Sequence, residues 1–403
     1  MTSDFKATPA GSDNTGVPAA ATPGGTVAVA LGGCIAMAAA MGIGRFVYTP
    51  ILPFMVETLG LSQAEAGIVA SANFLGYLLG ALAAAKASLP GGRRRWFLVA
   101  LAISALTTAA MAADASVPWF LLLRFASGIA SAFVLVFVSA LVLDRLAAAG
   151  RPGLSALHFG GVGLGIAASA VLVAQLAAAG VGWRGLWLAS GGLALVALVA
   201  VLRLVPAEQE PPPVPRARAK APPNPRLVAL IVAYGLFGFG YVITATFIST
   251  LVRLTPELQW LEPYVWLTVG LAGMPSVAVW GWIARRLGNG RAFALACLVE
   301  GVGVALSVLG SGAPAVIFAA ALLGGTIMGI TALGLVHARS LSSGDPRRSM
   351  ALMTAAFGLG QMIGPSFAGF AYGIGQSFLL PTLVAAGALL AAAALTMEWR
   401  RPN

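Results

Sequence analysis

Charged residues are scarce in this chain of 403 residues. Only 9% of them are charged, whereas 59% are hydrophobic, and the mean hydropathy is +0.90. A soluble domain carries about 25% charged residues, because its surface faces water. The scarcity of charge therefore argues against a soluble enzyme and predicts an integral membrane protein.

Several residue types that carry chemistry in other proteins are also rare. Both cysteines, Cys34 and Cys297, lie in apolar runs, and the chain has only two histidines, so neither a disulfide framework nor a CxxC metal site is expected. No lysine follows a glycine, which excludes a Walker A phosphate loop. The Gly-x-Gly-x-x-Gly pattern at 180–185 has no strand before it and is interpreted as a turn. We predict no cofactor and no bound metal.

What the chain does have is a series of apolar runs of about 20 residues, each long enough to cross the ~30 Å of a bilayer. They predict an all-helical membrane protein with twelve spans, at 27–56, 64–88, 95–114, 117–143, 154–179, 184–204, 227–252, 262–284, 291–311, 313–338, 348–373 and 377–397. Residues 1–26 are predicted to form a disordered cytoplasmic tail. Residues 205–226 hold eight prolines and predict a semi-rigid cytoplasmic linker. The linker divides the chain into two halves of six helices, 27–204 and 227–403.

The basic residues are distributed asymmetrically along these spans. Of the 24 lysines and arginines, 20 fall on the side of the N-terminal tail, Arg184 and Arg253 fall on the other side, and Arg45 and Arg124 lie within spans. The side rich in lysine and arginine is cytoplasmic. Both termini are therefore predicted to be cytoplasmic, in a multi-pass membrane protein. The net charge of +11 reflects topology, and no nucleic-acid partner is expected.

The two halves repeat one another in sequence. Residues 42–45 (Gly-Ile-Gly-Arg) align with residues 238–241 (Gly-Phe-Gly-Tyr), 196 positions later, and Gly-Leu-Gly at 163–165 aligns with Gly-Leu-Gly at 358–360, 195 positions later. These nearly equal offsets indicate a duplication of a six-helix unit. Two pseudo-symmetric halves around a central axis are typical of alternating-access transporters.

Several local patterns point to one superfamily. The loop at 281–291 is similar to the motif G-x-L-a-D-R-x-G-R, with Arg285 at the acidic position, and residues 124–128 are similar to R-x-x-x-G. Residues 360–369 are similar to G-x-x-x-G-P-x-x-x-G. Over about 27–400 the chain thus resembles the major facilitator superfamily. The resemblance implies a secondary active transporter, although Arg285 departs from the acid-mediated contact between the halves.

A narrower resemblance rests on two segments. Gly-Ile-Gly-Arg-Phe at 42–46 and the stretch from Tyr234 to Phe247 resemble the bacterial YbfB/YjiJ-type branch. This resemblance implies no particular substrate.

The two arginines within spans are the first candidates for substrate binding. A charged side chain in a bilayer costs at least ~2.5–3.5 kcal/mol unless it faces water or a partner. Arg45, with Tyr48 on its face, is predicted to offer its guanidinium group to an anionic substrate. Arg124 is predicted either to anchor the substrate or to tune the pKa of a coupling acid. The alternatives are a clamp on backbone carbonyls for Arg45 and a helix seam for Arg124. Pro50 and Pro53 are expected to bend the helix end beyond Arg45.

Glu300 and His158 are the candidates for ion coupling. Glu300 is the acid well inside a span, and a lone buried carboxylate tends to become neutral, as a proton carrier requires. His158 is able to titrate near neutral pH. For each, the alternative is a neutral side chain packed between helices.

The remaining candidates are polar or flexible positions on the spans. The predicted substrate lining also includes Asn73, Tyr77, Tyr241, Thr244 and Gln361, for each of which a helix–helix hydrogen bond is the alternative. The predicted gating residues are Gly360, Gly364, Pro365, Arg285 and Arg286. Pro275 and Pro365 are expected to break their helices locally.

Together these patterns predict a secondary active transporter that moves a small organic solute, an anion or an amphipathic molecule, by rocking its two halves. Proton coupling is a further hypothesis. The alternatives are an efflux antiporter for hydrophobic compounds and a membrane receptor or scaffold without turnover. The expected partners are the small-molecule substrate, protons and membrane lipids, and the protein is expected to be a monomer.

Overall fold

The computed structural model describes residues 23–86, 92–205, 224–342 and 346–397. These residues are almost entirely helical, and no strand occurs among them. Most of the predicted tail and most of the predicted linker lie outside the described residues.

The chain order of the helices follows the predicted spans. In the first half they are α1 (Pro23–Met37), the π-helix η1 (Ala38–Ile43), α2 (Tyr48–Leu59), α3 (Gln63–Lys86), α4 (Gly92–Ala110), α5 (Val117–Ala148), the short 3-10 helix η2 (Pro152–Leu154), α6 (Ser155–Ala178) and α7 (Trp183–Leu204). In the second half they are α8 (Pro225–Arg253), the 3-10 helix η3 (Pro256–Leu261), α9 (Glu262–Gly273), α10 (Ser276–Leu287), α11 (Asn289–Leu309), α12 (Gly312–Leu341), α13 (Pro346–Gly375) and α14 (Leu379–Thr396).

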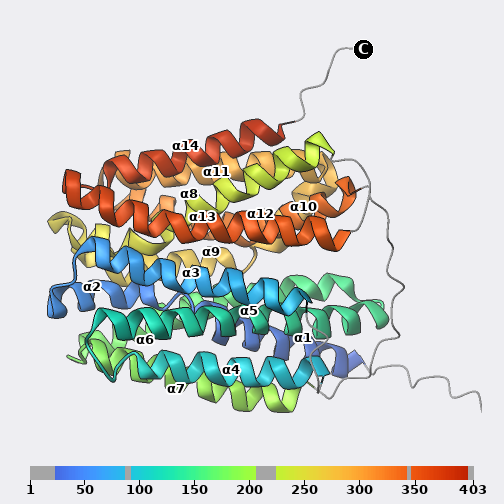
Figure 1. The fold of residues 1–403 in the computed structure, drawn as a ribbon, viewed down its shortest axis with the longest axis horizontal. Coiled ribbons are helices and arrows are strands. Elements are labelled where there is room, and N and C mark those ends of the chain that lie inside the picture. Colours follow the sequence, from blue (N-terminus) through green and yellow to red (C-terminus); the bar gives the residue numbers. More distant parts are fainter. Residues whose placement is uncertain (1–22, 87–91, 206–223, 343–345, 398–403) are drawn as a thin grey trace, which may run out of the picture.

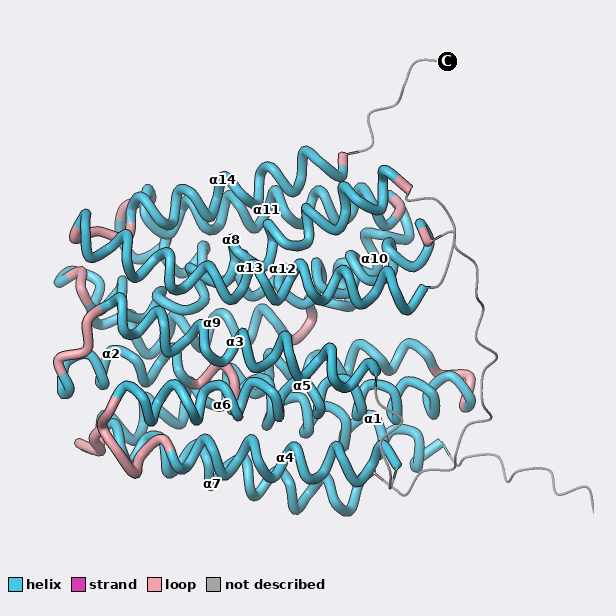
Figure 2. Tube along the Cα trace, viewed as in Figure 1, coloured by secondary structure: helices cyan, strands magenta, loops and turns pink. Residues whose placement is uncertain are grey.

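The helices form two groups that correspond to the two sequence repeats. Figure 1 shows α3–α7 in the lower part of the bundle and α10–α14 in the upper part, with the helices running roughly along one direction. Figure 2 shows most of the short loops at the two ends of the bundle. Between the halves, α3 packs against α13 and α6 packs against α9.

Among the described residues, nine helices are long and apolar enough to cross a membrane, with α1, η1 and α2 counted as one span. The bent pair formed by η3–α9 and α10 makes a tenth. The fold is therefore an all-helical membrane bundle, as the sequence predicts, whereas the count of twelve spans stays a prediction.

The first span is interrupted near its middle. The N–H of Gly44 donates to the Ala39 carbonyl (2.8 Å) and that of Phe46 to the Met41 carbonyl (3.2 Å), which is the i→i−5 pattern of a π-helix. A turn follows before α2 begins at Tyr48. The sequence predicts a bend beyond Arg45, at Pro50 and Pro53. The break instead contains Arg45, because the π-helix ends at Ile43.

The two later prolines behave differently from each other. At Pro275 the chain bends by 46° between α9 and α10, as predicted. At Pro365 the expected break does not occur, since α13 continues as a helix from Pro346 to Gly375. Proline is tolerated within membrane helices where neighbouring groups satisfy the freed backbone.

Glycine allows the halves to approach closely. A Cβ atom placed on Gly67 of α3 would overlap the carbonyl oxygen of Pro365 on α13, and one placed on Gly369 of α13 would overlap the carbonyl oxygen of Gln63. These are contacts with backbone atoms, which cannot rotate away as a flexible side chain does.

The close contact at Gly67 leads to a stability prediction. Gly67→Ala should lower the melting temperature of the purified protein, because the added methyl group forces α3 and α13 apart. The matched control is Gly192→Ala on α7, where an added Cβ meets no atom within 4 Å, and which should gain up to about 1 kcal/mol of helix propensity. Thermal unfolding in detergent measures both, and equal or higher stability of Gly67→Ala would contradict the prediction.

Candidate functional site

Arg45 lies in the break between η1 and α2, and its side chain is only 2% exposed. Its guanidinium lies over the ring of Tyr77, 4.0 Å from the centroid, and 4.7 Å from that of Phe74. Its Nη2 donates a hydrogen bond to Oε1 of Gln361 (2.7 Å), whereas its Nε has no partner among the described residues. Aromatic faces attract a cation by about 2 kcal/mol or more when desolvated. The amide and the rings thus hold the cation without balancing its charge.

Gln361 joins the two halves at this point. Its side-chain Nε2 donates to the hydroxyl of Tyr241, which is 1% exposed on α8. Arg45 and Tyr241 are the equivalent residues of the sequence repeat. One neutral amide on α13 therefore contacts both equivalent positions.

Arg124 on α5 holds the break open. Its Nη1 donates to the carbonyl oxygen of Gly44 (3.1 Å) and its Nη2 to that of Arg45 (2.8 Å). In a regular α-helix the N–H of Thr49 would donate to the Arg45 carbonyl, four residues back. Here it donates to the Phe46 carbonyl, three residues back (3.2 Å), so the Arg45 carbonyl is available to Arg124. The sequence predicts a clamp on backbone carbonyls as an alternative role for Arg45. In the structure it is Arg124 that makes this contact.

The other predicted polar residues surround the arginines in different ways. Asn73 donates its side-chain Nδ2 to the carbonyl oxygen of Arg124 (2.9 Å). Tyr48 lies with its ring centroid 5.0 Å from the Arg124 guanidinium and donates its hydroxyl to the carbonyl of Ala66 (2.9 Å). The Thr244 hydroxyl is buried without a partner among the described residues.

A cavity of about 10 Å³ lies between these groups. Both Arg45 and Arg124 line it, and none of its lining residues is acidic. Its volume is about that needed for one water molecule. In this conformation the site is closed around its own side chains.

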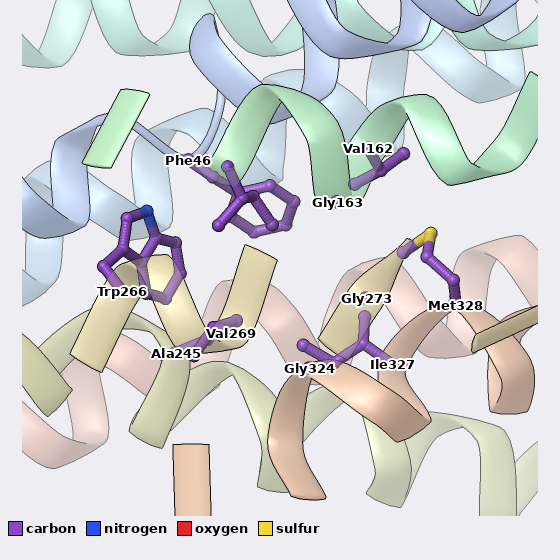
Figure 3. Close-up of a pocket in the computed structure, with 11 residues that line it drawn as sticks. Phe46, Val162, Gly163, Ala245, Trp266, Val269, Gly273, Gly324, Ile327 and Met328 are labelled. Carbon is purple, nitrogen blue, oxygen red and sulfur yellow. The ribbon is translucent and has the colours of Figure 1, made fainter. Parts of the chain in front are cut away.

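A second cavity of about 10 Å³ follows, and Figure 3 shows its lining side chains. Phe46 and Trp266 contribute its aromatic wall, with ring centroids 6.4 Å apart. The rest of its wall is small or aliphatic and comes from α6, α8, α9 and α12.

A third cavity, the Trp260 cavity, is the largest of the three at about 330 Å³. Its aromatic wall consists of Phe54, Trp260 and Trp266, and Arg253 and Glu262 are its charged residues. One face of α6, from Ala170 to Ala178, forms the opposite side.

Arg253 makes an ion-pair contact between the halves. Its Nε donates to Glu262 (2.6 Å) and its Nη1 to Glu57 of α2 (3.1 Å). Glu57 and Arg253 are 196 positions apart, as are Thr49 and Ala245, which are joined by a hydrogen bond of 2.7 Å. Equivalent positions of the repeat thus meet each other at this end of the bundle, the Glu57 end. Neither contact is among the predicted ones, although the residues of each pair are separated by the repeat offset of 196 positions.

Glu57→Gln should weaken the contact between the halves at the Glu57 end. The Glu57 side chain is 75% exposed, and exposed ion pairs contribute at most about 1 kcal/mol. The ratio of molecules with separated Glu57 ends to molecules with joined ones should therefore rise about fivefold or less. Spin labels on Thr58→Cys and Leu254→Cys measure this distance. An unchanged distance distribution would contradict the prediction, and Glu257→Gln on η3 is the control.

The two predicted coupling residues lie in different helices from the arginines. Glu300 on α11 is fully buried beside the hydroxyl of Thr326, and no arginine or lysine of the described residues hydrogen-bonds to it. His158 on α6 is also fully buried, with its Nε2 3.0 Å from the hydroxyl of Ser139. Their coupling role stays a prediction.

The predicted gating residues fall into two groups. Gly360 and Gly364 face α8, where an added Cβ would meet the carbonyl oxygens of Gly235 and Phe239. Arg285 and Arg286 are exposed at the end of α10. The guanidinium of Arg286 lies 4.4 Å from the ring centroid of Trp282.

Two groups of helices, close glycine contacts at their seam and a buried arginine site between them are the arrangement expected of a membrane transporter. Solved structures support the same architecture. The crystal structure of the nucleoside transporter NupG is similar to this chain with a TM-score of 0.67 at 15% identity, covering 92% of this chain and 98% of that one. A mutant of NupG gives a TM-score of 0.70 at 15% identity, covering 91% and 98%.

The family model described as "Uncharacterised MFS-type transporter YbfB" matches residues 37–397. The chain therefore belongs to the YbfB-type family of major facilitator transporters. The gallate transporter of Pseudomonas putida is 26% identical over 246 residues, or 60% of this chain and 54% of that protein. The chain thus spans about half the length of this curated relative.

Proposed function

We propose that the protein is a secondary transporter for a small aromatic carboxylate, which it moves across the bacterial inner membrane by alternating access. The carrying observation is Arg45, a buried cation that lies against aromatic rings and hydrogen-bonds to a neutral amide. A carboxylate adds the attraction between two opposite charges, and is able to accept two parallel hydrogen bonds from the guanidinium, whereas the neutral amide oxygen accepts one from Nη2. A carboxylate ligand would therefore displace the Gln361 amide.

The aromatic residues support the same substrate class. Phe74 and Tyr77 flank the guanidinium, and Phe46 contributes a third ring, 5.5 Å away. These rings would pack against the aromatic ring of a substrate whose carboxylate binds the guanidinium. The relative named for gallate, an aromatic carboxylate, supports this choice and supplies the test compound.

The orientation belongs to the same proposal. Basic residues in the last turns of helices, such as Arg145 on α5 and Arg285 on α10, lie at the opposite side of the predicted spans from Arg253. The positive-inside rule then places the Glu57 end on the periplasmic side. In this orientation the closed, ion-paired end faces outward.

Proton coupling is the final part of the proposal. Glu300 is the buried carboxyl group and His158 the buried imidazole of the described residues that are available for it. Glu300→Gln should remove the dependence of transport on an imposed pH gradient. If transport by this variant still depends on the pH gradient, Glu300 does not carry the coupled proton.

The test is uptake of radiolabelled gallate into proteoliposomes, with and without a pH gradient. Wild-type protein should accumulate gallate, and Arg45→Ala should reduce uptake at least 100-fold while the protein still folds. The control is Arg184→Ala, an exposed arginine that lies 5.2 Å from the ring of Trp183, and which should transport normally. Normal uptake by Arg45→Ala would overturn the arginine site.

A further inference from the structure

The Trp260 cavity has the size and chemistry of a ligand site of its own. Its volume of about 330 Å³ lies at the lower end of the range of 300–1,000 Å³ that small-molecule pockets occupy. Phe54 and Trp260 provide aromatic surface, and Arg253 and Glu262 provide polar groups. The small side chains on one face of α6, among them Ala174, leave the space between α6 and α9 unfilled.

The cavity is the first of three neighbours that lead to Arg45. Trp266 lines both the Trp260 cavity and the cavity of Figure 3. Phe46 lines both the cavity of Figure 3 and the arginine cavity. Since consecutive cavities share these aromatic walls, rotation of the Phe46 and Trp266 side chains would connect them.

Arg253 is able to exchange its ion-pair partner. Its Nε is bound to Glu262, which is 14% exposed, whereas its Nη1 is bound to Glu57, which is 75% exposed. A ligand carboxylate that takes the place of Glu57 leaves the number of ion pairs at Arg253 unchanged, because the Glu57 carboxylate returns to water. The guanidinium also lies 3.9 Å from the ring centroid of Phe54, so a ring bound beside it would meet aromatic surface.

We propose that the Trp260 cavity is an entry site, in which a small aromatic carboxylate binds before it reaches Arg45. Its carboxylate binds Arg253 in place of Glu57, and its ring packs against Phe54 and Trp260. Because the contact between Glu57 and Arg253 joins the two halves, binding in the entry site and release of that contact are the same event. The inference rests on the proposed function and adds a second, weaker site for the same substrate.

Equilibrium dialysis of radiolabelled gallate against the purified full chain tests the entry site. The Arg45→Ala variant removes the central site, and residual gallate binding at least tenfold weaker than that of the wild type should remain. Adding Ala174→Phe, which fills the cavity, should abolish this residual binding. The matched control adds Val171→Phe, also on α6 but 46% exposed, and should leave it unchanged. Adding Glu57→Gln to Arg45→Ala removes the competing carboxylate and should tighten the residual gallate binding about threefold.

Each outcome decides between the two sites. Gallate binding to the wild type but not to Arg45→Ala overturns the entry site and leaves the central site standing; an acyl chain of a lipid would then be the occupant of the cavity. Residual binding that survives Ala174→Phe also overturns it. If the Ala174→Phe variant does not fold, the comparison is between Arg45→Ala and Arg45→Ala with Glu57→Gln. Equal gallate affinities of these two proteins overturn the entry site. Absence of gallate binding to the wild type overturns the proposed substrate class, and the entry site with it.

Discussion

Gln361→Glu is expected to stop transport and to raise the melting temperature of the protein by several degrees. The new carboxylate would stand where the amide oxygen accepts from Nη2 of Arg45 at 2.7 Å, and would compensate a cation that is 2% exposed. An ion pair replaces a hydrogen bond between the guanidinium and a neutral acceptor, in a region where water screens little. The variant therefore carries its own mimic of the substrate carboxylate.

Transport should fall at least 100-fold in this variant, because the bond between Arg45 and α13 no longer exchanges for substrate. Gallate binding at the central site should weaken by a similar factor. Gln361→Met is the matched control, since it has a similar length without a hydrogen-bonding group, and it should keep gallate binding within about tenfold. Normal transport by Gln361→Glu would show that Arg45 is not the anchor.

The broad architecture was accessible from the sequence because lipid imposes simple rules. Long apolar runs had to be helices, and the offset of 196 between Gly44–Arg45 and Gly240–Tyr241 revealed the two halves. The same offset pairs Glu57 with Arg253 and Thr49 with Ala245. Residues on a pseudo-two-fold axis meet their own equivalents, so a repeat in sequence predicts contacts as well as topology.

The details of the site were not accessible in this way. Arg45 and Gln361 are 316 positions apart and belong to different spans in different halves, so no local pattern joins them. The break at Gly44–Val47 depends on Arg124, whose guanidinium accommodates the two freed carbonyl groups. Both arginines are conspicuous in the sequence as charges within spans. Only their partners in the structure distinguish them: Arg45 binds an exchangeable side-chain amide, whereas Arg124 binds backbone carbonyls.

This difference predicts a large loss of stability on substitution of Arg124 and a small change on substitution of Arg45. Arg124→Met should destabilise the protein by about 3 kcal/mol or more, because it removes two hydrogen bonds from a charged donor. The buried Arg45 carbonyl loses its side-chain donor, and the Gly44 carbonyl keeps only the Ser127 hydroxyl, 3.3 Å away. Arg45→Met should change the free energy of unfolding by no more than about 1 kcal/mol, since an uncompensated buried cation is itself costly. Thermal unfolding in detergent measures both variants.

Transport and stability should therefore separate at Arg45 and fall together at Arg124. Arg45→Met should abolish gallate uptake in a protein that melts close to the wild type. Arg124→Met should lose uptake because the break that orients Arg45 collapses, and its melting temperature should fall in parallel. Arg124→Lys keeps the charge but cannot present two donors in a fixed fork, so it should recover only part of the stability. Equal stability losses at the two positions would mean that both guanidinium groups stabilise the fold, and that neither is available to bind a substrate.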